Sequence, residues 1–293
     1  MSLPAAFVSV VLIWSTTPLA IKWSAMDVGF SFAVFSRMVI GVVLCAALLM
    51  LFRVRFPLHR QACRAYLAGG LSMFSAMSLS YWSAQFVSSG MISVLFGLSP
   101  LITSLGAMVW LKEEKFTAGK LAGMLFGLLG LALVFRGSFS LGAGASLGLI
   151  VLFAAVVSQS LGLVWLKRIG DDSPPLAMTL GTLIVALPLF FAAWWWADGH
   201  LPEVMPERAM AATVYLGVFG SVLGFALYYY LIKHMEAGRI ALITLVTPVV
   251  ALLLGHGLNN EVVLPQVWLG ALSILLGLCL HHWSAKWAGI LSR

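Results

Sequence analysis

The sequence has little charge and few cysteines. Of its 293 residues, 9% are charged and 61% are hydrophobic, and the mean hydropathy is +1.03. Water cannot keep such a chain dispersed, so the composition excludes a soluble enzyme or binding domain. The three cysteines form neither a metal-binding spacing nor a disulfide framework. We therefore expect a polytopic membrane protein, whose basic pI near 9.6 reflects loops at a lipid surface and no binding of nucleic acid.

Acidic residues are missing from the middle of every apolar stretch. All ten Asp and Glu lie at the ends of these stretches or between them. Ionisable groups inside hydrocarbon are costly and usually functional, so their absence argues against a carboxylate proton relay. The six histidines are scattered over loops and ends, which argues against an intramembrane enzyme. We expect no catalytic centre, no metal and no cofactor.

Apolar stretches of membrane-spanning length occur ten times. A helix needs about 20 residues to cross about 30 Å of hydrocarbon. The approximate spans are 4–22, 31–52, 65–86, 90–111, 119–136, 146–167, 175–197, 209–233, 238–258 and 266–285. The connections are short, which also argues against a receptor or scaffold with a soluble domain.

The basic residues predict an orientation. If the chain crosses ten times with both termini on one side, 13 of the 17 Lys and Arg lie on that side. Cytoplasmic loops retain positive charge, so we expect both termini in the cytoplasm. The other side holds Lys22, Arg37, Arg136 and Arg208.

The sequence also repeats itself. The stretch from Gly90 to Leu101 matches the stretch from Gly238 to Val249, so Pro100 falls on Pro248. After a slip of one residue, Glu114, Gly123 and Gly130 fall on Glu261, Gly270 and Gly277. Each copy holds five spans, an odd number, so the second copy must be inverted. We predict an all-α membrane protein with ten transmembrane helices in two inverted five-helix repeats, residues 1–140 and 141–293, with a substrate site near the midplane between them.

These residues resemble a known family. The first repeat contains Leu12-Ile-Trp14-Ser15, Lys22, Arg37, Gly90, Pro100, Leu111-Lys-Glu-Glu114 and Gly123. The pattern is similar to the EamA-type repeat of the drug/metabolite transporter superfamily over essentially the whole chain. The resemblance implies a ten-helix carrier in a bacterial inner membrane, often an exporter of amino acids or related metabolites.

Arg37 lies roughly 9 Å inside the second span, at 1.5 Å per residue. One interpretation is that its side chain extends to the outer headgroups or pairs with Asp27 or Glu261. The other is that it anchors a substrate carboxylate, which a guanidinium binds bidentately. The residue type allows both.

Aromatic and hydroxyl side chains lie together within three spans. Ligand pockets combine apolar walls with a few polar groups, and the alternative is ordinary helix packing. The candidates for such a pocket are Trp14 and Ser15 in the first span, Ser78, Tyr81 and Trp82 in the third, and Tyr228 and Tyr229 in the eighth.

Pro100 and Pro248 are predicted to lie inside helices and to act as hinges. A proline frees a backbone carbonyl one turn earlier, here near Phe96 and Thr244. Either these carbonyls face a cavity or a neighbouring hydroxyl satisfies them. We expect the side chains of Ser99, Gln159 and Thr244 to line the same space.

The sequence therefore predicts a uniporter-like exporter of amino acids or similar metabolites, with broad specificity and alternating access. A proton-coupled multidrug or nucleotide-sugar carrier is the alternative. The expected partners are a small-molecule substrate and membrane lipid, and the expected state is a monomer or weak dimer.

Overall fold

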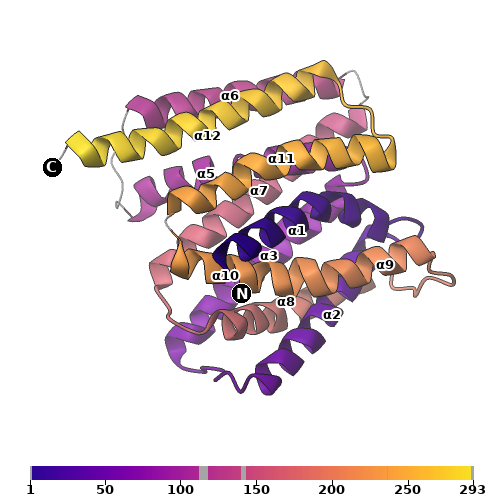
Figure 1. Cartoon of the computed structure of the whole chain (residues 1–293). Helices are drawn as coiled ribbons and strands as arrows, with labels where there is room; N and C mark the ends of the chain where they lie inside the picture. The colour runs from indigo at the N-terminus through magenta and orange to yellow at the C-terminus, as the bar shows by residue number, and fades with distance from the viewer. Residues whose placement is uncertain (1, 112–117, 140–142, 236, 292–293) are drawn as a thin grey trace.

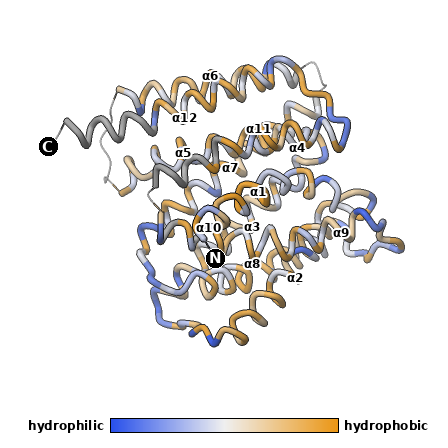
Figure 2. Tube along the Cα trace, viewed as in Figure 1, coloured by the Kyte–Doolittle hydropathy of each residue, from blue (hydrophilic) through white to orange (hydrophobic). Residues whose placement is uncertain are grey.

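A computed structural model describes residues 2–111, 118–139, 143–235 and 237–291 (Figure 1). Within these ranges, the side-chain environment is described except at 138, 139, 143, 229, 232, 233, 237–242, 244, 245 and 282–291. The described residues form helices joined by short connections, and they contain no strand. Figure 2 shows apolar residues along the helices and hydrophilic residues mainly near the helix ends.

Ten helical runs correspond to the ten predicted spans. Their bounds are α1 (Leu3–Ser24), α2 (Phe30–Leu51), α3 (Arg60–Ser83), α4 (Ser89–Phe96) with α5 (Ser99–Gly106) and η1 (Ala107–Leu111), α6 (Ala118–Phe139), α7 (Ala143–Ile169), α8 (Pro175–Ala197), α9 (Glu207–Tyr215) with η2 (Leu216–Leu223) and α10 (Gly224–His234), α11 (Ala237–Asn259) and α12 (Pro265–Leu291). The segments η1 and η2 are π-helical. Seven runs are long and apolar enough to cross a membrane, judged on the described residues alone. The described apolar parts of α11 and α12 are shorter, and α3 begins with a polar turn.

The fourth span differs from the sequence prediction at Pro100. This proline does not lie inside a continuous helix: α4 ends at Phe96, and Pro100 lies in the first turn of α5. A first-turn position is where proline is tolerated, because its missing N–H has no intrahelical partner there. Pro248 does lie inside α11, as predicted. The two matched prolines therefore have different roles in the backbone.

The helices α6 and α12 pack together along one edge of the bundle (Figure 1). A Cβ atom added at Gly123 would lie 2.6 Å from the carbonyl oxygen of Gly277, and one added at Gly130 would lie 2.6 Å from that of Gly270. The contacts run in opposite sequence directions, so the helices are antiparallel. Small residues allow this close backbone approach.

These glycine contacts also obey the internal repeat. The repeat matches Gly123 with Gly270 and Gly130 with Gly277, so exchanging the two copies converts one contact into the other. Equivalent helices that run antiparallel are related by a two-fold axis across them, as inverted repeats require.

The remaining contacts follow the same exchange. The packing of α3 on α7 corresponds to that of α9, η2 and α10 on α1, and the packing of α5 on α7 corresponds to that of α11 on α1. The helices α2 and α8 are equivalent in the two copies, so exchanging the copies leaves their contact unchanged. The same holds for the contact of α4 with α11. Every described helical run of the first half thus packs against the second half.

Candidate functional site

Arg37 of α2 lies inside the protein, between the two halves. Its residue is 3% exposed. The Nε atom donates to Ser221 Oγ of η2 at 2.9 Å, and Nη1 donates to the hydroxyl of Tyr81 on α3 at 3.5 Å. Tyr81 is completely buried. The cluster of Arg37, Tyr81 and Ser221, called here the arginine cluster, joins two helices of the first half to one of the second.

Glycines in η2 let Ser221 reach the guanidinium. A Cβ added at Gly217 would lie 2.5 Å from Ile40 of α2, and one added at Gly220 would lie 3.0 Å from Nη2 of Arg37. Larger side chains would therefore hold η2 away from α2. The π-helical geometry of this segment is rare and occurs frequently at functional sites.

Arg37 has no acidic partner among the described residues. Among the described residues, no carboxylate lies within 4.0 Å of its guanidinium, and Glu261 pairs instead with Lys22. The residue is also almost completely covered by other parts of the protein. Neither form of the structural interpretation, headgroup contact or pairing with Asp27 or Glu261, describes Arg37. A buried cation is costly unless an anion joins it, so the arginine cluster is suited to an anionic ligand group.

Several hydroxyls near the core lack partners. The Oγ atoms of Ser15 on α1 and of Ser78 on α3 are buried and make no hydrogen bond. Ser78 lies one turn from Tyr81, so both side chains share one face of α3. Buried polar groups are usually hydrogen-bonded, and an exception calls for an explanation. A polar ligand beside the arginine cluster provides one.

The predicted aromatic residues separate into two places. Trp14 of α1 packs against Tyr228 of α10, with ring centroids 4.7 Å apart. Trp82 of α3 instead contacts Phe86, with ring centroids 4.7 Å apart. Phe86 follows the end of α3 and lies against Gly148 of α7. The structure therefore brings Trp14 and Tyr228 together but leaves Trp82 apart from them. The side chain of Tyr229 lies outside the described residues.

A second polar group joins α5 to α7. The Ser99 and Ser160 hydroxyls are 3.1 Å apart, and Ser160 also lies within hydrogen-bond distance of the Ser99 carbonyl. Gln159, next to Ser160, is half-buried. Gly97, at the break before α5, lies beside Pro248, whose Cγ would be 3.5 Å from an added Cβ. The helix α11 thus passes the break between α4 and α5 at Pro248. The side chain of Thr244 lies outside the described part of the chain.

Glu261 closes one end of the bundle. Its Oε2 accepts hydrogen bonds from the backbone N–H of Ser89 at 2.9 Å and from the Ser89 hydroxyl at 2.7 Å. Its Oε1 accepts from Asn259 at 3.0 Å and lies 3.6 Å from Lys22 Nζ. Lys22 also donates to the carbonyl of Val87. These residues, called the Glu261 clamp, tie the end of α1, the start of α4 and the end of α11.

Local backbone geometry buries this carboxylate. Asn260 adopts φ +50°, a left-handed conformation that Asn tolerates, and the chain folds back so that the N–H of Glu261 donates to the carbonyl of Gly255. A Cβ at Gly255 would lie 2.5 Å from Oε2, so only glycine leaves the required space. The carboxylate also meets the N-terminus of α4, where the helix dipole favours negative charge. Sequence reasoning placed Glu261 at a span end but did not find these partners.

No group of three His, Cys, Asp or Glu that is suited to hold a metal ion occurs among the described residues. The arginine cluster and the Glu261 clamp are two of the polar contacts that join the two halves. Ser221 had no signal in the sequence, because serine is common in membrane helices and no basic or acidic residue lies beside it.

Ten apolar helical runs, paired by an internal two-fold relation, define a polytopic membrane protein made from a duplicated unit. The model of the EamA-like transporter family matches residues 3–136 and 146–282. The chain therefore belongs to this family and is a multi-pass membrane transporter, as the resemblance of its motifs predicts.

Relatives in other organisms agree with this assignment. The chain is 26% identical to an uncharacterized inner membrane transporter, YedA of Escherichia coli, over 274 residues that cover 92% of this chain and 87% of the relative. It is 26% identical to a probable amino-acid metabolite efflux pump of Escherichia coli over 205 residues, 65% of this chain and 69% of the relative. A crystal structure with 19% identity matches 97% of this chain and 98% of its own with a TM-score of 0.67, which supports the fold.

Proposed function

We propose that the protein exports amino acids or related small metabolites, and that Arg37 binds the substrate carboxylate. The observation that carries this proposal is a buried guanidinium between the halves with no acidic partner among the described residues. A guanidinium fork matches a carboxylate in geometry and charge. The likeness to a probable amino-acid metabolite efflux pump supports the same substrate class.

Other polar and aromatic groups complete the proposed site. Ser15 and Ser78 offer hydroxyls that lack protein partners, and Trp14 with Tyr228 supplies an apolar wall. In this proposal Ser99 and Gln159 line the same pathway at the α5–α7 contact. Trp82, Tyr229 and Thr244 remain sequence-based candidates for the pathway. Few directional contacts and much aromatic surface favour broad specificity.

The proposed mechanism is alternating access between the repeats 1–140 and 141–293. The Glu261 clamp holds one end shut in this conformation, and the break at Gly97 beside Pro248 provides a hinge. In this proposal the opposite end and both termini lie on the cytoplasmic side of a bacterial inner membrane, which the excess of basic residues in the loops of that side supports. Export then requires the clamp to open while the cytoplasmic end closes.

The proposed transport is uniporter-like. Glu261 is the buried acid of the clamp, and its carboxylate already has hydrogen bonds and a nearby cation. Every acidic residue lies at a span end or in a connection, so the sequence offers no carboxylate relay across the midplane. The substrate gradient alone then drives net flux.

Reconstitution into liposomes tests the proposal. We expect flux of a radiolabelled neutral amino acid to persist without a pH gradient. Arg37→Gln should reduce flux of the amino acid by about tenfold or more, since hydrogen bonds to charged groups contribute about 1.5–3 kcal/mol. The amide of the same amino acid, which lacks the carboxylate, should be transported equally by both proteins.

The matched control is Ser36→Ala, which removes an α2 hydroxyl that bonds only within its own helix. It should leave flux unchanged. Equal loss of acid and amide transport in Arg37→Gln would contradict a carboxylate anchor. Flux that needs a pH gradient would favour the proton-coupled alternative, and no flux of any amino acid would remove the substrate class.

A further inference from the structure

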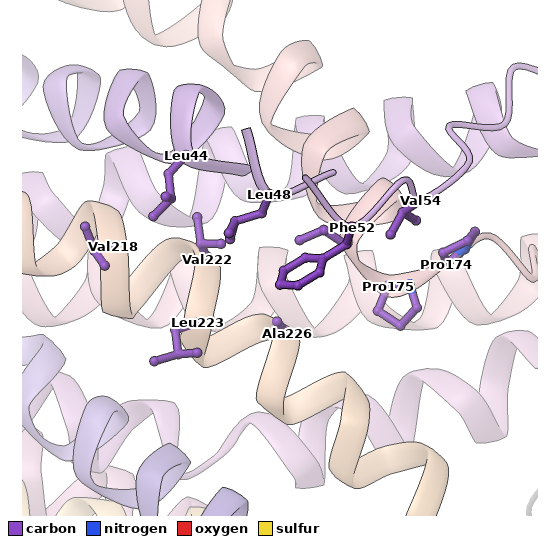
Figure 3. A pocket seen from close by; sticks show the side chains of 11 residues that line it. Leu44, Leu48, Phe52, Val54, Pro174, Pro175, Val218, Val222, Leu223 and Ala226 are labelled. Carbon is purple, nitrogen blue, oxygen red and sulfur yellow. The ribbon is translucent and has the colours of Figure 1, made fainter. Parts of the chain in front are cut away.

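An apolar cavity of about 570 Å³ lies between α2, the start of α8, and η2 with α10 (Figure 3). Its walls are entirely apolar, and they are formed by Leu44, Leu48, Phe52, Val54, Pro174, Pro175, Leu176, Val218, Val222, Leu223 and Ala226. We call this cavity the α2–α10 groove. It has a volume typical of ligand sites, about 300–1,000 Å³.

The groove is separate from the arginine cluster. Between Arg37 and Leu44, α2 touches η2 directly: a Cβ added at Gly41 would lie 3.3 Å from that of Ser221. The same added atom would lie 3.5 Å from Leu183 of α8. The contact therefore lies between the guanidinium and the groove. This contact therefore blocks the direct path from Arg37 to the groove for the side chain of a substrate whose carboxylate binds Arg37.

The groove has the length of a lipid chain segment in one leaflet. Leu44 and Phe52 are eight residues apart on α2, which corresponds to about 12 Å of helix. One leaflet contributes about half of a hydrocarbon core of about 30 Å. In Figure 3, Leu48 points toward Val222, and the ring of Phe52 points toward Ala226. Water needs polar partners to fill a cavity, and these walls provide none.

Two exposed arginines flank a lining residue of the groove in the sequence. Val54 lines the groove, and its neighbours Arg53 and Arg55 are exposed. Shortly before the lining residue Pro174, Asp172 is exposed, but Asp171 is already engaged by His59 at 3.0 Å and by the N–H of Ser173. Basic residues next to a membrane attract anionic lipid headgroups.

We propose that the α2–α10 groove binds an anionic phospholipid of the leaflet beside Arg53 and Arg55. One acyl chain fills the apolar walls, and the phosphate lies at the two arginines. The acyl chain makes the van der Waals contacts that the side chains lining an empty cavity would lack. Because the groove wall includes Val222, next to Ser221, the bound lipid supports the helix that carries the partner of Arg37.

Native mass spectrometry of the purified full-length protein tests this proposal. The probes are phosphatidylglycerol and phosphatidylcholine with identical acyl chains, added in equal amounts. We expect wild type to prefer phosphatidylglycerol. Arg53→Gln with Arg55→Gln should lower that preference by about fivefold for each arginine. The matched control is Arg64→Gln, an exposed arginine of α3 that does not flank the groove, and it should keep the preference.

A second pair of variants tests the apolar part of the site. Ala226→Phe fills the groove and should reduce adducts of both lipids several-fold. Ala47→Phe adds the same bulk to an exposed position of α2 outside the groove and should change nothing. Equal binding of the two lipids to wild type, an equal effect of Arg64→Gln, or undiminished adducts in Ala226→Phe would each overturn the proposal.

Discussion

Glu261 in the second half accepts two hydrogen bonds from Ser89 in the first half, one from the backbone N–H and one from the hydroxyl. The two residues are 172 positions apart in sequence. Their contact joins the start of α4 to the loop after α11, so movement of the halves at this end must break it. The Glu261 clamp is therefore the natural place to test how the bundle opens.

Glu261→Gln should open the clamp more often. The amide loses the attraction to Lys22 and weakens both bonds from Ser89, and bonds to a charged acceptor contribute about 1.5–3 kcal/mol. We expect a thiol introduced by Ser93→Cys, one turn inside α4, to react about tenfold faster with an impermeant maleimide. The measurement uses a protein whose three native cysteines are replaced.

The control for this labelling is Glu203→Gln, an exposed carboxylate in the connection between α8 and α9. It should leave the labelling rate unchanged. If Glu261→Gln labels at the wild-type rate while remaining folded, the clamp does not limit opening at this end.

Gly220→Ala should disturb Arg37 without touching its charge. The added Cβ would lie 3.0 Å from Nη2, so the guanidinium must shift. Ser221→Ala removes the acceptor of Nε. In either variant we expect KM for an amino acid to rise several-fold, with protein stability changed by about 1–2 kcal/mol or less. Unchanged KM in both variants would show that the arginine cluster does not contact substrate.

Gly277→Ala should destabilise the contact between α6 and α12. Its Cβ would lie 2.6 Å from the carbonyl of Gly123, and overpacking typically costs about 1–3 kcal/mol. Gly130→Ala, at the matching position of the first repeat, should lower the melting temperature by a similar amount. Gly257→Ala, whose Cβ would meet nothing within 4 Å, is the control. Unequal effects at Gly277 and Gly130 would contradict the two-fold relation of these contacts.

Asp171, in the connection between α7 and α8, should make the stability of the protein depend on pH. Burial raises the pKa of this carboxyl, but hydrogen bonds from Ser173 and His59 lower it by more, so the folded-state pKa lies below the ordinary value. A lowered pKa stabilises the folded state above the unfolded value of about 3.9, and this contribution is lost as the pH falls through the folded-state pKa.

We therefore expect Asp171→Asn to lower the melting temperature at pH 7, with a difference that shrinks as the pH falls below about 4. Because His59 is largely exposed, the expected effect is about 1 kcal/mol or less. Asp172→Asn, on the exposed neighbour, is the control for removing a charge. A difference that stays constant between pH 7 and pH 3 would contradict this account.

The sequence predicted the helices more accurately than their breaks. All ten spans appear as helical runs, although α3 begins at Arg60, five residues before the predicted start, because a polar turn continues the helix beyond the apolar part. The break at Gly97 was not predicted. A proline can kink a helix or begin a new one, and neighbouring helices decide between these outcomes.

The sequence predicted some residues of the arginine cluster and missed another. Arg37 and Tyr81 were selected individually, and they do meet. Ser221, the second partner of Arg37, was not selected, because it lies 184 positions from Arg37 and its residue type is ordinary in a membrane helix. Trp82 fits the same local pattern as Tyr81 but points to Phe86, since adjacent residues face different sides of a helix.

The sequence by itself determined that the chain is a membrane protein of ten helices in two repeats, because hydrocarbon requires long apolar segments whose backbone bonds are satisfied internally. Only the tertiary structure decided that Glu261 is buried at the start of α4 and that Ser221 lies against Arg37. These contacts depend on how closely distant helices approach, which glycines such as Gly220 and Gly255 permit but which no local pattern specifies.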